Sequence, residues 1–134
     1  MVYAVIDTNI IVSSFITKSP SSATRRVINS MLSGKIKPLY NDEILAEYFD
    51  VLSRSKFHLN EVRINELLYF IKQNGIDSSR FPYDGNMPDE DDRVFYEVCL
   101  SKEDSFLVTG NLKHFPKEPQ VITAAEMMEI LDNQ

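Results

Sequence analysis

The chain has one cysteine and two histidines in 134 residues, too few for a disulfide framework or a cysteine-rich metal site. Cys99 lies within an apolar stretch, which predicts that it is buried as a small hydrophobic side chain rather than used as a nucleophile. His58 and His114 are far apart in the sequence, so neither is expected to share a zinc site with Cys99. Disulfide and zinc–thiolate chemistry are therefore not expected.

Glycine is also scarce, with four residues, and no stretch resembles a glycine-rich phosphate loop or a dinucleotide fingerprint. A nucleotide cofactor is therefore not expected. No stretch approaches the roughly 20 apolar residues that a membrane helix needs. The segment from Met1 to Ile6 has no basic leader and ends at Asp7, so it predicts a first strand rather than a secretory signal. We expect a soluble, cytoplasmic protein.

Basic residues are outnumbered, with 14 lysines and arginines against 20 acidic residues and a formal net charge of -6. A chain with this balance is not expected to bind nucleic acid through a broad basic face. A metal ion could still join the protein to a nucleic-acid substrate. The length and the 43% hydrophobic content fit a single domain, residues 1–134, with one core.

Strand-like and helix-like segments alternate along the chain. Continuous apolar runs predict buried strands at residues 2–6, 36–40, 106–108 and 121–122. Apolar residues spaced by three or four, together with capping residues, predict helices that begin near residues 23, 42, 61, 92 and 124. The alternation predicts an α/β fold, a three-layer α/β/α sandwich with a mostly parallel central sheet.

One carboxylate stands where a parallel sheet would place a functional group. Asp7 follows the first strand directly, and the chain is expected to turn through Thr8 and Asn9 into a second apolar stretch, residues 10–12. Because open α/β sheets carry their sites at the carboxyl ends of strands, Asp7 is more readily a functional residue than a simple turn residue. Asn9 could bind a metal-held water or hold the Asp7 loop through backbone hydrogen bonds.

A run of four acidic residues, 89–92, precedes a predicted helix. Acidic side chains are favoured at a helix amino terminus, which by itself explains one or two of them. Four in succession repel one another, and a bound divalent cation is the simplest way to offset that repulsion. We therefore expect Asp89 and Asp92 to join Asp7 at a cation site.

Glu47 is a further candidate because of its angle on its helix. It lies at the margin of the apolar stripe, about 40° from Val51, whereas Asp50 points well away from that stripe. A carboxylate at the margin can face a cleft. Glu47 could instead be an ordinary solvated glutamate with no role in a site, and the helix pattern alone favours this second interpretation.

Four segments in order resemble the PIN-domain family: residues 5–13 (VIDTNIIVS), 44–47 (ILAE), 88–93 (PDEDDR) and 108–116 (VTGNLKHFP). Within that family the chain looks most like the branch described as toxin components of prokaryotic toxin–antitoxin systems. The resemblance covers nearly the whole chain. Each segment alone is a weak signal, but the four in this order are fairly specific.

The resemblance implies an α/β/α fold and an endoribonuclease that uses Mg²⁺ or Mn²⁺ to cleave RNA phosphodiester bonds. It assigns Asp7, Glu47 and Asp92 as the catalytic acidic residues that hold metal, with Thr109 lining the site. We expect phosphate contacts from Arg93, Lys113 and His114, with Thr8 or Thr109 placing a water. An antitoxin protein and a second copy of the chain, in a homodimer, are the implied partners.

Asn111 departs from the family pattern, because many members have a fourth acidic residue at this position. Asp89 is the nearest residue that could compensate as a metal ligand. The departure leaves a second interpretation open, a catalytically weak or inactive PIN-like module that binds RNA or protein. A phosphotransfer domain with Asp7 as nucleophile is a weaker alternative, because residues 7–9 lack the second aspartate of the usual phosphatase motif.

Overall fold

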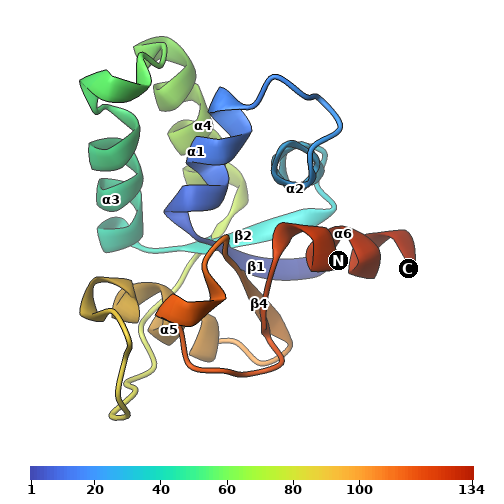
Figure 1. Ribbon diagram of the computed structural model, residues 1–134. Coiled ribbons are helices and arrows are strands. Elements are labelled where there is room, and N and C mark those ends of the chain that lie inside the picture. Colours follow the sequence, from blue (N-terminus) through green and yellow to red (C-terminus); the bar gives the residue numbers. More distant parts are fainter.

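Five parallel strands form the central sheet of the structure, a computed structural model that describes residues 1–134 (Figure 1). The strands are β1 (Val2–Ile6), β2 (Ile36–Tyr40), β3 (Ile76–Asp77), β4 (Ser105–Val108) and β5 (Val121–Ile122). Their order is β3-β2-β1-β4-β5, so β1 is central, with β2 and β4 beside it. All four predicted strands are present, and β3 is an additional short strand at one edge.

Six α-helices surround the sheet: α1 (Thr8–Ile16), α2 (Ala23–Leu32), α3 (Asp42–Leu52), α4 (Glu61–Asn74), α5 (Arg93–Leu100) and α6 (Ala124–Asp132). Figure 1 shows α1, α2, α3 and α4 above the sheet and α5 below it. Helices therefore cover both faces, and the predicted α/β/α sandwich is confirmed. None of the helices combines the length and apolar character that crossing a membrane requires.

The central strand β1 is buried on both faces. Ala4, Val5 and Ile6 expose at most 1% of their surface. Helix α5 packs on this strand from one side, and Figure 1 shows other helices over the opposite face of the sheet, which is why the sequence of β1 is continuously apolar rather than alternating. The buried apolar side chains form one continuous core, and Cys99 lies within it, as predicted.

Four predicted helix starts are confirmed by their capping hydrogen bonds. The side chains of Ser22, Asn41 and Asn60 accept from backbone N–H groups two or three residues further on, at the beginning of α2, α3 and α4. Thr123 and Glu126 form a reciprocal capping box at the start of α6. These short-range signals could be found from the sequence because both partners lie within one helical turn.

Helix α1 was not predicted. The chain does not turn after Asp7; the helix begins at the next residue, and Asp7 caps it by accepting from the Thr8 backbone N–H at 2.8 Å. The helix packs against both α2 and α3, and Ile10 and Ile11 are fully buried. A helix covered on several sides lacks the polar face whose periodicity would have revealed it.

Candidate metal centre

A cleft of about 450 Å³ opens where β1 and β4 end. These strands are paired neighbours, so Asp7 after β1 and Thr109 after β4 meet although they are 102 positions apart. Helices α1 and α3 form one side of the cleft, and the segment around residues 89–92 with the turn at residue 114 forms the other. Four carboxylates line it: Asp7, Glu47, Asp89 and Asp92.

Asp7 is the most deeply placed of these carboxylates, with 4% of its surface exposed. One carboxylate oxygen accepts from the Thr8 backbone N–H at 2.8 Å, and the other accepts from the Thr109 hydroxyl at 2.7 Å. Burial raises the pKa of Asp7, and these two hydrogen bonds oppose the increase. Each oxygen keeps a lone pair, so the fixed carboxylate can still bind a cation.

Glu47 faces the same cleft from α3. Its carboxylate accepts a hydrogen bond from the Thr8 hydroxyl, so Thr8 contacts Asp7 through its backbone and Glu47 through its side chain. Burial is the main cause of the raised pKa of Glu47. Asp50, on the same helix, lies on the exposed surface and pairs with Arg54 at 3.3 Å.

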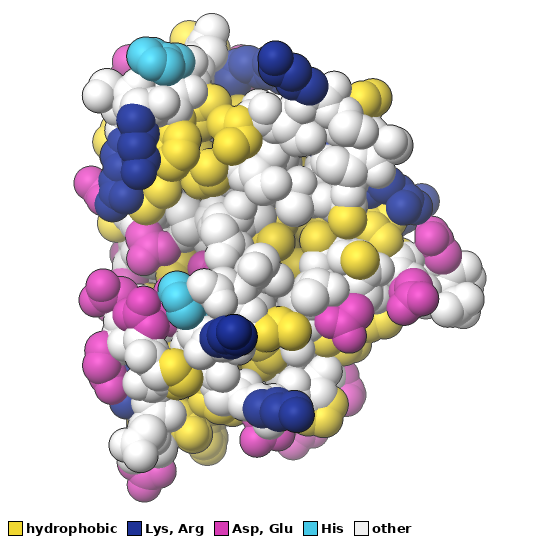
Figure 2. All heavy atoms as spheres, in the orientation of Figure 1, with side chains coloured by type: hydrophobic (Ala, Val, Ile, Leu, Met, Phe, Trp, Pro, Cys, Tyr) yellow, Lys and Arg dark blue, Asp and Glu magenta, His cyan; other side chains and the backbone are white.

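Asp92 and Asp89 meet the imidazole of His114 at the opposite wall. Nδ1 of His114 lies 3.1 Å from Asp92 Oδ2 and 3.8 Å from Asp89 Oδ2. The pKa of Asp92 is raised to about 7, first by burial and then by the charges of Asp7 and Asp89. Acidic side chains gather beside a histidine at the left edge of the face in Figure 2. Asp92 is the end of a short 3₁₀ helix, η2 (Glu90–Asp92), that leads into α5.

Asn111 contacts the histidine and not the carboxylates. Its side-chain amide lies 2.8 Å from Nε2 of His114, and its backbone N–H donates to the Thr109 hydroxyl at 3.0 Å. Asn9, on α1, joins this helix to the loop after β4, because its Oδ1 accepts a hydrogen bond from the Gly110 backbone N–H at 3.0 Å. The two asparagines thus fix the loop after β4 against α1 and against His114.

Two of the residues expected to contact phosphate lie elsewhere. The Arg93 guanidinium donates to Glu90 at 2.8 Å, to the Gly85 carbonyl at 3.1 Å and to the Tyr83 carbonyl, so it ties down the loop that leads to the acidic run. Lys113 is exposed on another short 3₁₀ helix, η3 (Leu112–His114). Neither residue lines the cleft.

Sequence reasoning missed Glu97, which holds the same loop from within α5. Its carboxylate is almost fully buried and accepts from Arg80 Nε at 2.7 Å and from the Tyr83 backbone N–H at 2.8 Å. These bonds keep the pKa of Glu97 below its usual value despite burial. The signal in the sequence was a single acidic residue between apolar neighbours, Tyr96 and Val98.

The cleft therefore concentrates negative charge with little to offset it. The pKa values of Asp7, Glu47 and Asp92 are all raised, with burial the first cause in each case. Ionised carboxylates in such a position favour a bound cation, which supplies the missing positive charge. Carboxylate oxygens are the ligands that Mg²⁺ and Mn²⁺ prefer, so the donor set fits a hard divalent cation.

The chain is similar to a known protein family. A family model described as a PIN domain matches residues 3–113. The matched range includes all four carboxylates of the cleft and ends one residue before His114. No curated protein and no solved structure matches the chain.

Proposed function

Since the chain belongs to the PIN-domain family, we propose that it is a metal-dependent endoribonuclease that hydrolyses phosphodiester bonds of exposed RNA. The observation that carries the proposal is the convergence of Asp7, Glu47, Asp89 and Asp92 on one cleft. Elements far apart in the sequence deliver these side chains to the same place. Their raised pKa values indicate a site that is incomplete without a cation.

Asp7, Glu47 and Asp92 would hold the cation, with Asp89 as a further ligand. A bound Mg²⁺ or Mn²⁺ supplies an activated water and neutralises charge on the scissile phosphate. The protein's own contribution is to fix the ligands. Thr8 and Thr109 donate hydroxyl hydrogen bonds to Glu47 and Asp7, which sets the orientation of both carboxylates before substrate arrives.

The side of the cleft formed by α1 and α3 also offers an apolar wall to a nucleic-acid base. Val12, Ile16, Val51 and Phe57 line it beside the carboxylates. Bases of single-stranded RNA can stack on an aromatic ring, whereas bases inside a duplex cannot reach it. The position of this apolar wall beside the carboxylates supports an unpaired RNA strand as the substrate.

A cleavage assay tests the proposal directly. The purified chain should cut a single-stranded RNA oligonucleotide in the presence of Mn²⁺ or Mg²⁺ and should stop when a chelator removes the metal. A DNA oligonucleotide of the same sequence is the matched substrate control. Binding of RNA without any cleavage, at saturating metal, would instead identify the chain as a PIN-like binding module.

The apolar wall leads to a second expectation. Phe57→Leu keeps an apolar side chain on the core but removes the ring, so KM for RNA should rise about fivefold or more while kcat changes little, since base stacking contributes about 1–3 kcal/mol. Phe81→Leu, at an exposed position outside the cleft, is the control. An unchanged KM in Phe57→Leu would remove this wall from the substrate site.

The biological role that we propose is the toxin of a toxin–antitoxin pair. It rests on the resemblance of the motif segments to that branch of the family. A neighbouring short gene for a DNA-binding antitoxin would support it. The antitoxin and a second copy of this chain, in a homodimer, are the protein partners proposed with this role, and the cytoplasm is the proposed compartment.

A further inference from the structure

His114 presents a ring nitrogen to the acidic wall of the cleft. Nδ1 lies 3.1 Å from Asp92 Oδ2 and 3.8 Å from Asp89 Oδ2, and these ligand atoms all lie within 4.8 Å of one another. Two ligands of one cation, each roughly 2.1 Å from it and at right angles, lie roughly 3 Å apart. The three side chains are therefore spaced so that one cation can contact all of them after small adjustments.

The second ring nitrogen of His114 already has a partner of the kind that metal-binding histidines use. A histidine that binds metal through one nitrogen commonly donates its other N–H to an acceptor, which fixes the ring. The Asn111 amide lies 2.8 Å from Nε2. A half-turn of that amide brings its oxygen to Nε2, so Asn111 can accept the N–H when Nδ1 binds a cation.

Asn111 is itself held by the inner part of the site. Its backbone N–H donates to the Thr109 hydroxyl, and that hydroxyl donates to Asp7. The imidazole is thus linked through Asn111 and Thr109 to the carboxylate at the other side of the cleft. This connection fixes the ring relative to Asp7 as well as to Asp92, which is a property of a positioned ligand rather than of a mobile surface histidine.

We propose that His114 is a metal ligand that acts with Asp89 and Asp92 and makes the site prefer Mn²⁺ to Mg²⁺. The inference rests on the proposed metal-dependent function and specifies its metal. Mn²⁺ also binds oxygen ligands well, but as a transition-metal ion it accepts an imidazole nitrogen more readily than Mg²⁺ does, since Mg²⁺ is bound by oxygen ligands and retained water. Asn111 is the positioning residue that orients the ring.

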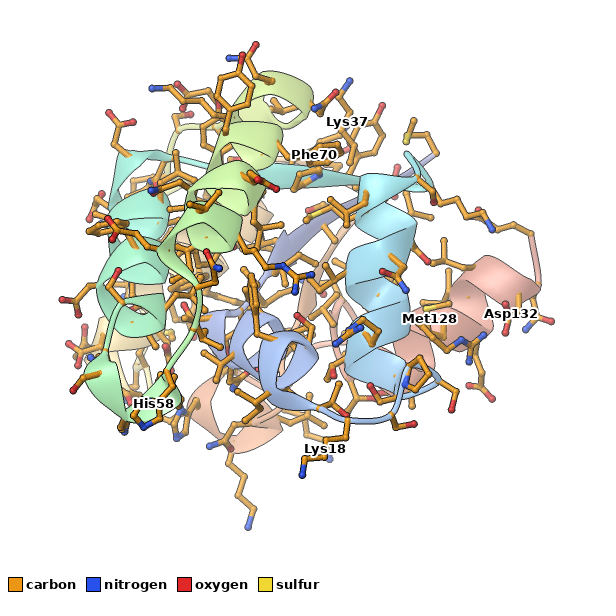
Figure 3. All side chains as sticks on the ribbon, turned by 90° about the horizontal axis from the view of Figure 1, so that it is seen from above. Lys18, Lys37, His58, Phe70, Met128 and Asp132 are labelled. Atoms are coloured by element: carbon orange, nitrogen blue, oxygen red, sulfur yellow. The ribbon has the colours of Figure 1, made fainter.

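Pulsed electron paramagnetic resonance of the full chain with one equivalent of Mn²⁺ tests the inference. Directly bound imidazole gives a nitrogen hyperfine coupling, and incorporation of nitrogen-15 histidine should change it. The chain has only one other histidine, His58. Figure 3 labels His58, which lies in the turn between α3 and α4 and adopts φ 52°, a backbone conformation that asparagine tolerates. His58→Asn should keep the coupling, and His114→Gln should lose it.

Calorimetric titrations give an independent readout. His114→Gln should weaken Mn²⁺ binding about tenfold or more while changing Mg²⁺ binding by less than about twofold, because Mn²⁺ gains more from the nitrogen ligand than Mg²⁺ does. An equal loss for both metals would overturn the proposed preference. The labelled wild-type protein answers the ligation question even if a variant fails to fold.

The outcomes separate this inference from the proposed function. Mn²⁺ binding and RNA cleavage without a histidine coupling would overturn the role of His114 and leave the nuclease proposal standing. A coupling that persists unchanged in His114→Gln would do the same. Failure of wild-type protein to bind Mn²⁺ at all would overturn both proposals together.

Discussion

Asp7→Asn is expected to lower RNA cleavage by roughly 1,000-fold, because a lost charged ligand removes several kcal/mol of transition-state stabilisation. The same variant should be at least as stable as the wild type without metal. Asparagine can still cap α1 through its side-chain oxygen, and it replaces a buried carboxylate whose pKa is raised by burial. Single-turnover cleavage rates and metal-free thermal unfolding of both proteins measure the two effects.

The combination of lost activity with retained stability distinguishes a ligand from a structural residue. Glu47→Gln and Asp92→Asn should show the same pattern, since their pKa values are raised as well. Asp50→Asn is the matched control on α3, because its side chain is exposed and paired with Arg54. If Asp50→Asn lost as much activity as Glu47→Gln, the ligand assignment on this helix would be wrong.

The metal-free protein is expected to lose stability as the pH rises from about 4 to about 7. In the folded state the pKa of Asp92 is about 7, whereas the ordinary value is 3.8. Between these values the folded chain binds more protons than the unfolded chain, so the free energy of unfolding falls as pH increases. After a discount for partial solvent screening, we expect a loss of about 2 kcal/mol, which corresponds to several degrees in Tm.

Added metal should reverse this loss. At pH 8 saturating Mn²⁺ binds only the folded site, so it should raise Tm, whereas at pH 4 protons occupy the carboxylates and the increase should be small. Differential scanning calorimetry in chelator and in Mn²⁺ across this range measures both curves. The Arg80-bound Glu97 does not obscure the trend, because its lowered pKa affects stability only below about pH 4.5.

Asp92→Asn provides the control for the pH dependence. Without metal, the stability of this variant should change little between about pH 4 and 7, because the carboxyl group with the most strongly raised pKa is gone. Asp7 and Glu47 face the same cleft and would leave a smaller residual slope. A wild-type protein that is more stable at pH 8 than at pH 5 without metal would contradict the electrostatic account of the site.

The sequence by itself determined the alternation of the strands with most of the helices and the identity of the acidic residues. β1 could be predicted because a strand buried on both faces is continuously apolar, and α3, α4 and α6 could be predicted because each cap lies beside the helix that it begins. The position of Glu47 at the margin of its helix also follows from the helical angle alone.

The tertiary structure decided how the acidic residues are supported. Thr109 reaches Asp7 only because β1 and β4 are paired neighbours, and no local pattern joins residues 102 positions apart. Helix α1 could not be predicted because it packs against both α2 and α3, so its sequence lacks the amphipathic period that marks a surface helix. The packing of η3 beside η2 likewise brings His114 to Asp92. Short-range chemistry supplied the ligands, and long-range packing arranged them into a site.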